Sequence, residues 1–256
     1  MRDRRAELRE APRVGPSPAC LDPGAGLGSL VQMRSGDVSS LGQARREFLR
    51  KESPWVIGGG VVVLVALRAL IGDLTWRDAV AIAALLAIYQ FGEWAIHVYL
   101  LHAKPIRIRG RQVETVAARA HRAHHGDPSD LDMVLLYWWQ AAFLMLVAVP
   151  LTVGLVSVII TLLAGPVPLG VMVSGAIAGY CMVFVYEWTH FLIHTAYVPR
   201  TGAYKAVWRN HRLHHFKNEH FWHGITNNLS DRVLGTNPDQ REVPKSKTAR
   251  SLDPAG

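Results

Sequence analysis

The stretch NHRLHHFKNEHFWHG, residues 210–224, carries five histidines in fifteen positions. Three of them are spaced i, i+3 and i+4, which places them on one face of a helix. The same spacing recurs upstream in AHRAHHG, and two histidine pairs accompany the two boxes. The histidines of the chain stand at positions 97, 102, 121, 124, 125, 190, 194, 211, 214, 215, 220 and 223. None of them stands alone, and this clustering is the strongest signal in the sequence.

The histidine groups indicate a metal centre rather than scattered polar side chains. A single histidine is usually solvated or hydrogen-bonded, but ten imidazoles that converge from four segments are costly to desolvate unless they bind something. Neutral imidazole is the commonest protein ligand of transition ions. Because one ion takes about four to six ligands, ten histidines indicate two ions.

Long apolar runs predict an integral membrane protein. About 20 apolar residues cross about 30 Å of hydrocarbon, and four segments reach that length: 54–72, 79–102, 133–164 and 169–193. The third run is long enough to form a hairpin near Pro150. However, Lys and Arg gather in 1–53, in 103–132 and after 196, and positive residues mark the cytoplasmic side. Four spans keep all three basic segments on that side, so we expect the N-terminus, the active site and the C-terminus to be cytoplasmic.

The spacing of His97 and His102 conflicts with an ideal helix. Residues five apart on an α-helix point about 140° apart. We therefore expect the helix to unwind or tighten near His102, so that both imidazoles reach one site.

Charge and composition restrict the partners. The net charge is +8, but no recognisable nucleic-acid motif accompanies it, and the basic residues flank the apolar runs. Anionic lipid head groups are therefore the expected partner, and nucleic acid is not. Cys20 and Cys181 give no disulfide framework. Segments 1–50 and 238–256 are rich in polar residues, Gly and Pro, and we expect both to be disordered.

Four further residues near the boxes have open interpretations. Glu93 and Glu187 lie within predicted spans, where carboxylates are functional candidates. Each could accept the ring N–H of a metal-bound histidine, His97 or His190, and packing or snorkelling is an equally good interpretation. His220 and His223 lie outside the repeated boxes, where direct ligation, an outer role beside the ions and a surface position all remain open.

In order, the boxes read H-x4-H, H-x2-H-H, H-x3-H and H-x2-H-H. This series resembles the fatty acid hydroxylase superfamily (sterol desaturase/fatty acid hydroxylase), closest to the fatty acid 2-hydroxylase branch. The resemblance covers about residues 88–237 through EWAIHVYLLH, HRAHHGD, EWTHFLIHTAYVP and NHRLHHFKNEHFWHGITNNLSDRVLGT. It implies an all-α integral membrane protein in which four transmembrane helices carry a cytosolic helical cap and a dimetal site, with a catalytic domain over 51–237.

Carried over residue by residue, the resemblance also implies the metal ligands. They would be His97, His102, His121, His124, His125, His190, His194, His211, His214 and His215. Unlike eukaryotic fatty acid 2-hydroxylases, the sequence shows no N-terminal haem domain with a His-Pro-Gly-Gly motif, so we expect a separate electron-transfer protein. His220 and His223 are not expected as ligands in that branch, which leaves room for another substrate.

The expected activity is O2-dependent hydroxylation of a lipid acyl chain by two iron ions. Zinc fits the same nitrogen ligands but cannot change oxidation state, so a zinc-filled form should be inactive. A carotenoid ring hydroxylase and a sterol oxidase or desaturase are alternatives with the same metals. A membrane metal transporter or sensor is the non-enzyme alternative. It would place ligands along a path through the spans, whereas these histidines gather at one end.

Overall fold

The computed structural model describes residues 33–252, and within that range four helical segments are long and apolar enough to cross a membrane. The first is α2 (Ser53–Ile71), and the second is α3 (Trp76–Ala95) with its π-helical extension η2 (Ile96–Leu101). The fourth is α7 (Leu169–Ile193). The four predicted spans are therefore confirmed.

The third span is one continuous helix. Its parts are α5 (Trp138–Phe143), the π-helix η4 (Leu144–Ala148) and α6 (Val149–Ala164). Pro150 stands in the first turn of α6 and directly follows the π-helical stretch, where the widened ladder accommodates a residue without an N–H. The run therefore changes to a π-helix within the span and does not fold back as a hairpin.

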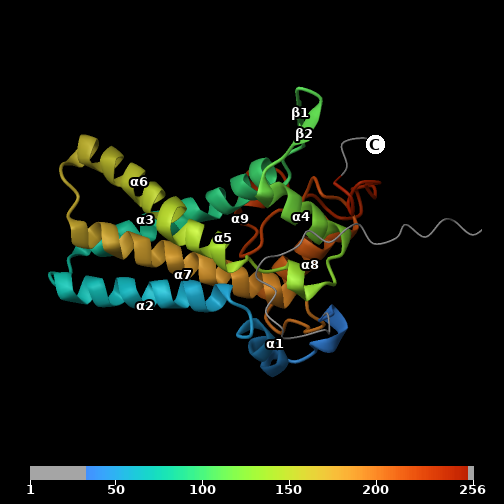
Figure 1. The fold of residues 1–256 in the computed structure, drawn as a ribbon, viewed down its shortest axis with the longest axis horizontal. Coiled ribbons are helices and arrows are strands. Elements are labelled where there is room, and N and C mark those ends of the chain that lie inside the picture. Colours follow the sequence, from blue (N-terminus) through green and yellow to red (C-terminus); the bar gives the residue numbers. More distant parts are fainter. Residues whose placement is uncertain (1–32, 253–256) are drawn as a thin grey trace, which may run out of the picture. The chain divides into compact units, whose positions relative to one another are not determined.

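Helix α7 is the centre of the membrane bundle, and α2, α3 and α6 lie along it (Figure 1). Tyr180 of α7 packs with Ile57 of α2 and with Met145 of η4, and its hydroxyl donates to the Met145 carbonyl. A Cβ on Gly60 would come within 2.8 Å of the Tyr180 ring. Glycine at this position therefore allows α2 to approach α7 closely.

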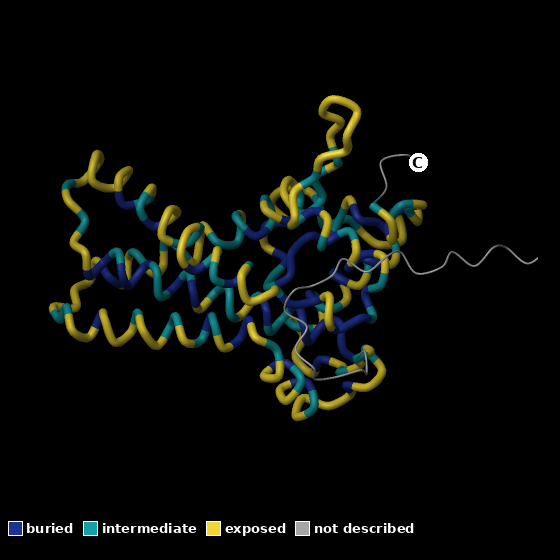
Figure 2. The backbone as a smooth tube through the Cα atoms, viewed as in Figure 1, coloured by how far each residue is buried: buried dark blue, intermediate teal, exposed yellow. Residues whose placement is uncertain are grey.

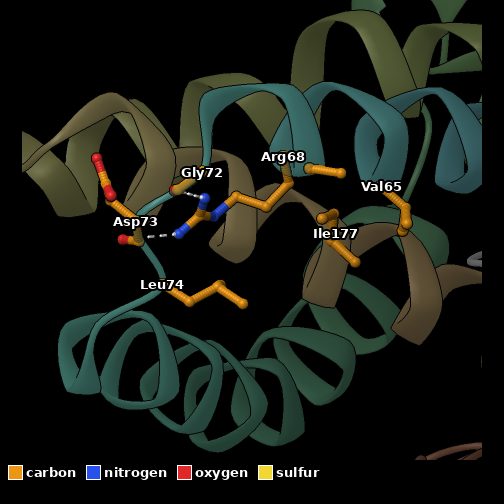
Figure 3. A pocket seen from close by; sticks show the side chains of 7 residues that line it. Val65, Arg68, Gly72, Asp73, Leu74 and Ile177 are labelled. Carbon is orange, nitrogen blue, oxygen red and sulfur yellow. Dashed lines mark hydrogen bonds between the residues drawn. The ribbon is translucent and has the colours of Figure 1, made fainter.

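The C-terminal end of α2 is joined to the bundle by a buried ion pair. The Arg68 guanidinium donates to Asp78 Oδ1 of α3 at 2.8 Å (Nη2) and 3.1 Å (Nε), and Ser174 of α7 donates to the same oxygen at 2.6 Å. Figure 3 shows Arg68 also pointing at the Gly72 and Asp73 carbonyls, beside a cavity of about 340 Å³. The Arg68 charge is thus fully paired.

Helices that lie outside the four spans and follow the second span in the sequence form a cap at the other end of the bundle. They are α4 (Val116–Gly126), η3 (Leu131–Met133), α8 (Gly202–Phe216) and α9 (Leu229–Val233). Figure 2 shows buried backbone concentrated around α4 and α8, whereas the outer sides of α2 and α6 are exposed.

One hairpin departs from the expected all-α fold. Strands β1 (Ile106–Ile108) and β2 (Arg111–Val113) pair antiparallel and project from the cap (Figure 1). Arg109 and Gly110 between them both have positive φ, 49° and 78°. Such values are typical of a two-residue hairpin turn, and the alternating Ile-Arg-Ile suits an extended strand.

The part of segment 1–50 that the structure describes is ordered, unlike the expectation. Residues 35–37 form η1 (Ser35–Asp37), and α1 (Leu41–Phe48) follows with Ser40 as its N-cap. Phe48 is buried and makes an edge contact with Trp188 at 5.1 Å between ring centroids. A few apolar side chains on one face suffice to dock this polar segment, which composition alone did not indicate. Residues 1–32 lie outside the described range.

The segment after Pro238 also differs from the expected disorder. Residues 238–252 have no regular secondary structure, but Ser246 N–H donates to the Lys217 carbonyl at 2.8 Å, and Trp222 Nε1 donates to the Pro238 carbonyl at 3.3 Å. Hydrogen bonds fix this segment to the cap, and its apolar residues Val243 and Ala249 are buried there. The segment therefore has defined contacts as far as residue 252 despite its polar composition.

Candidate metal centre

The ten histidines of the repeated boxes gather into two clusters of five. Within each cluster, one ring nitrogen per residue lies within 4.8 Å of all the others, so each cluster could hold a metal ion. We name them cluster A (His97, His102, His121, His125 and His214) and cluster B (His124, His190, His194, His211 and His215). His102 is partly exposed, and the others are buried.

The π-helix η2 explains how His97 and His102 reach the same cluster. The His102 N–H donates to the His97 carbonyl at 3.1 Å, which is the i to i+5 bond of a π-helix. The wider turn brings residues five apart close to the same side, and the two ring centroids are 5.0 Å apart. The expected departure from α geometry is therefore a local widening of the helix.

Each box helix divides its histidines between the clusters. Helix α4 gives its i and i+4 residues, His121 and His125, to cluster A, and its i+3 residue His124 to cluster B. Helix α8 does the reverse: His211 and His215 belong to cluster B, and His214 to cluster A. Span ends complete the clusters, with η2 and its C-cap supplying cluster A and α7 with its C-cap supplying cluster B. The two histidine boxes and the two histidine pairs of the sequence thus correspond to two similar half-sites.

The distances between ring nitrogens fit metal ligation. His97 and His102 Nε2 atoms each lie 3.1 Å from His121 Nε2, and His215 Nε2 lies 3.0 Å from His211 Nε2. Separations of this size would let neighbouring imidazoles bind one ion through metal–nitrogen bonds of about 2.1 Å. Five nitrogens per cluster exceed the four of a tetrahedral site and would suit a transition ion that takes five or six ligands.

Burial keeps the imidazoles neutral, which is the protonation state that binds metal. It lowers the pKa of His125 to about 4, although the bond to the Ala249 carbonyl acts in the opposite direction. It also lowers the pKa of His194 to about 3. The pKa of the other histidines outside the spans is also lowered, mainly by burial and in addition by the neighbouring imidazoles. They are His102, His121, His124, His211, His214 and His215.

Backbone carbonyls fix the second ring nitrogen of several histidines. In cluster A, His97 Nδ1 lies 2.6 Å from the His223 carbonyl, His125 Nδ1 lies 2.8 Å from that of Ala249, and His214 Nδ1 lies 2.8 Å from that of Phe221. In cluster B, His194 Nδ1 lies 2.9 Å from the Pro128 carbonyl. A carbonyl can only accept, so Nδ1 carries the proton and Nε2 presents its lone pair to the cluster.

Glu93 and Glu187 have other partners than the expected ring N–H groups. Glu93 accepts the backbone N–H groups of Ile225 and Thr226 at 2.5 and 3.0 Å, together with the Thr226 hydroxyl at 2.5 Å. It therefore fixes the loop after α8, while His97 donates to the His223 carbonyl.

Glu187 likewise binds scaffold groups rather than His190. It accepts the Ser53 hydroxyl at 2.6 Å and the Leu136 N–H at 3.2 Å. Both carboxylates are buried, and each joins a spanning helix to another segment of the chain. Local sequence spacing suggested a histidine ring as the partner of each carboxylate. The partners in the structure are distant in the sequence, so the spacing could not reveal them.

His220 and His223 have different positions. The His220 side chain is 70% exposed and belongs to neither cluster. His223 is buried, and its ring centroid lies 5.2 Å from that of His214 and 5.4 Å from that of His97. It is not a member of cluster A but packs against it and supplies the carbonyl for His97.

Sequence reasoning missed the residues that hold His223. Asp231 is fully buried and accepts the N–H groups of His223 and Gly224 at 3.0 and 2.7 Å and the Thr236 hydroxyl at 2.6 Å. Burial alone would raise the pKa of Asp231, but the bonds from His223, Thr236 and Gly224 outweigh it and lower the pKa. A Cβ on Gly224 would stand 2.0 Å from the Asn227 carbonyl oxygen. Neither residue type carries a motif that would have revealed this role.

Known proteins with related sequences were found for most of the chain. A dihydroceramide fatty acyl 2-hydroxylase of Arabidopsis thaliana, FAH2, is 29% identical over 153 residues, covering 60% of this chain and 58% of its own length. A second one, FAH1, is 27% identical over 209 residues, covering 78% of this chain and 80% of its own. The chain thus spans under two thirds of FAH2 and about four fifths of FAH1.

The fold also has a solved counterpart. Full-length Scs7p, of which only the hydroxylase domain is visible, superposes with a TM-score of 0.58 over 76% of this chain and 68% of that one, at 20% identity. This likeness concerns the fold alone. The fatty acid hydroxylase family model matches residues 82–236, which include all ten histidines of clusters A and B. The chain therefore belongs to the fatty acid hydroxylase family.

Proposed function

We propose that the protein is a membrane-bound lipid hydroxylase with clusters A and B as the ligands of two iron ions. The observation that carries this proposal is the convergence of ten imidazoles from η2, α4, α7 and α8 on two adjacent five-nitrogen sites at one end of the spans. Family membership and the relatives named as fatty acyl 2-hydroxylases support hydroxylation of an acyl chain, with the 2-position as the finer expectation.

The reaction requires an external reductant. Hydroxylation converts a C–H bond and O2 into C–OH and water, and it consumes two electrons and two protons. Bound iron would supply the redox chemistry that no side chain can provide. We propose that a separate electron-transfer protein delivers the electrons.

The protein positions the imidazoles that would bind the ions, and it excludes water from them. The carbonyls that bind His97, His125 and His214 orient their ring nitrogens before an ion enters. Burial excludes water from nine of the ten imidazoles, which limits side reactions of activated oxygen.

We place the clusters, the N-terminus and the C-terminus on the cytoplasmic side. Four spans return the chain to its starting side, and the basic segments flank the cap end of the bundle. This arrangement brings the site within reach of a cytoplasmic electron donor.

The alternative activities differ in what they predict. Carotenoid ring hydroxylation and sterol oxidation or desaturation use the same metals and change only the product. A transporter or sensor would need ligands along the spans, but both clusters lie at one end of the bundle, so this alternative has the weaker support.

Product analysis in cells tests the proposal. Wild type and His125→Ala are expressed with a compatible reductase under aerobic, iron-replete conditions, with His220→Ala as the matched control because its ring is exposed. Mass spectrometry of lipid extracts should show an added oxygen on acyl chains with wild type and His220→Ala but not with His125→Ala. Loss of two hydrogens would indicate desaturation instead. Identical extracts from wild type and His125→Ala would contradict the hydroxylase assignment.

A further inference from the structure

The C-terminal strap, defined here as residues 240–252, lies beyond the part of the chain that the family model matches, which ends at residue 236. It nevertheless contacts the helices of the candidate metal centre. After the loop that follows α9, the strap passes the last residues of α8 and then the last residues of α4. Those two helices carry six of the ten histidines.

The first half of the strap is fixed to the end of α8. The Lys217 carbonyl accepts the Ser246 N–H at 2.8 Å, and Asn218 Nδ2 donates to the Pro244 carbonyl at 3.2 Å. Glu219 Oε1 accepts the hydroxyls of Ser246 and Thr248 at 3.0 and 2.5 Å. Glu219 is buried, so these bonds are shielded from competing water.

The second half of the strap binds the end of α4. Arg250 Nε donates to the His125 carbonyl at 3.0 Å, and Arg250 Nη2 donates to the Gly126 carbonyl at 2.6 Å. These are carbonyls of the last helical turn, which lack intrahelical partners and favour a cation. The same guanidinium lies over the ring of Phe216, the last residue of α8, at 5.5 Å from its centroid. Arg250 thus connects the ends of the two box helices.

The residue next to Arg250 reaches cluster A directly. The Ala249 carbonyl accepts from His125 Nδ1 at 2.8 Å, and Ala249 is itself buried. A backbone carbonyl cannot be lost by substitution, so only the position of the strap determines whether this acceptor is present. Two residues hold the strap in this position: Glu219, which is buried, and Arg250, which donates to two carbonyls.

We propose that the C-terminal strap is a positioning element of cluster A, in which Arg250 holds the Ala249 carbonyl against His125 and so fixes the ring for metal binding. This inference rests on the metal centre of the proposed function but not on its substrate. It assigns a role to a segment outside the matched region. It also predicts that loosening the strap weakens one ion and not the other.

A pair of arginine substitutions tests this proposal. Arg250→Ala removes the side-chain bonds to the His125 and Gly126 carbonyls of α4. Arg241 in the same strap is 84% exposed and pairs with Asp239 two residues away, so Arg241→Ala is the matched control. Arg250→Lys keeps the charge but loses the bidentate geometry, and should give an intermediate result. The full-length chain is loaded with iron(II) anaerobically, and iron per chain is measured during incubation with a chelator.

We expect Arg250→Ala to lose one of two ions, with an affinity about 10–100-fold lower, the range for residues that support a metal ligand. In the His211→Ala background only cluster A is intact, and adding Arg250→Ala should weaken the remaining ion. In the His214→Ala background only cluster B is intact, and adding Arg250→Ala should leave the remaining ion unchanged. Equal weakening of both ions, or wild-type retention in Arg250→Ala, would overturn the proposal.

Two further measurements keep the result interpretable. If Arg250→Ala fails to fold, Arg250→Lys provides the same comparison, and wild-type iron retention in a folded Arg250→Lys would then overturn the proposal. Lipid products are measured separately. If Arg250→Ala loses one ion but wild type forms no hydroxylated lipid, the proposed function is contradicted and the role of the strap is still supported.

Discussion

Clusters A and B contain the same number of imidazoles but are supported differently. In cluster A, three rings donate to carbonyls of the C-terminal part of the chain, those of Phe221, His223 and Ala249. In cluster B, His194 donates to the Pro128 carbonyl, which lies between α4 and η3 and not in the C-terminal part of the chain.

Cluster B depends instead on helix packing. The Nδ1 atoms of His124, His211 and His215 are buried without a hydrogen-bond partner within residues 33–252. Phe191 and Ile193 of α7, next to His190 and His194, are fully buried among apolar side chains. The difference shows that two similar sites can be fixed by two different means. Loops and carboxylates determine cluster A, and the bundle itself determines cluster B.

Removing one ligand from each cluster should have the largest effect. We expect His214→Ala to lose the ion of cluster A and His211→Ala that of cluster B, because each deletes a ligand and leaves a cavity among neutral imidazoles. Iron per chain should fall from two to one in both, and hydroxylation by more than about 100-fold, beyond the range for supporting residues. Elemental analysis and product assays check this, with His220→Ala as control. Two retained ions in either variant would contradict the ligand assignment.

Asp231→Asn should weaken cluster A alone. The substitution disturbs the acceptor of the His223 and Gly224 N–H groups, and through the His223 carbonyl it disturbs the ring of His97. Affinity for one ion should fall about 10–100-fold while the other is unchanged. Chelator titration measures both, and Asp239→Asn is the control because Asp239 pairs with an exposed arginine. Equal weakening at both sites would show that the supports are not separate.

Metal removal should loosen the two clusters to different extents. After chelation, amide hydrogen exchange should rise in 221–228 and 240–252, which contain the loops beside cluster A, and rise little in α7. The reason is that buried helix packing persists without metal, whereas loops held at metal-bound rings do not. Exchange measured by mass spectrometry with and without iron checks this. Faster exchange in α7 than in the two loops would reverse the comparison.

Asp78→Asn should leave both clusters unchanged. The Arg68–Asp78 pair lies at the far end of α2 from Ser53 and Glu187, and breaking a buried pair costs about 3–5 kcal/mol of folding free energy. The thermal unfolding temperature in detergent should fall, while iron per chain stays at two. A loss of iron below the unfolding temperature would show that the two ends of the bundle are coupled.

The sequence was sufficient for the spans and for the histidines because both are repeated chemical patterns. Apolar runs set the four helices, and i, i+3, i+4 spacing set the two box faces. The division of each box between two clusters was not predictable, because it depends on how α4 and α8 cross. The partners of Glu93 and Glu187, and the role of Arg250, arise from contacts between residues 51–134 positions apart. Ordered polar segments such as the strap escape prediction because long-range hydrogen bonds and few buried apolar residues, here Val243 and Ala249, hold them.

The shared use of α4 and α8 has a consequence for how the centre assembles. Each of these helices presents nitrogen atoms to both clusters, so an ion in either cluster would restrict the motion of both helices. A chain that keeps only one ion should therefore retain the arrangement of α4 and α8.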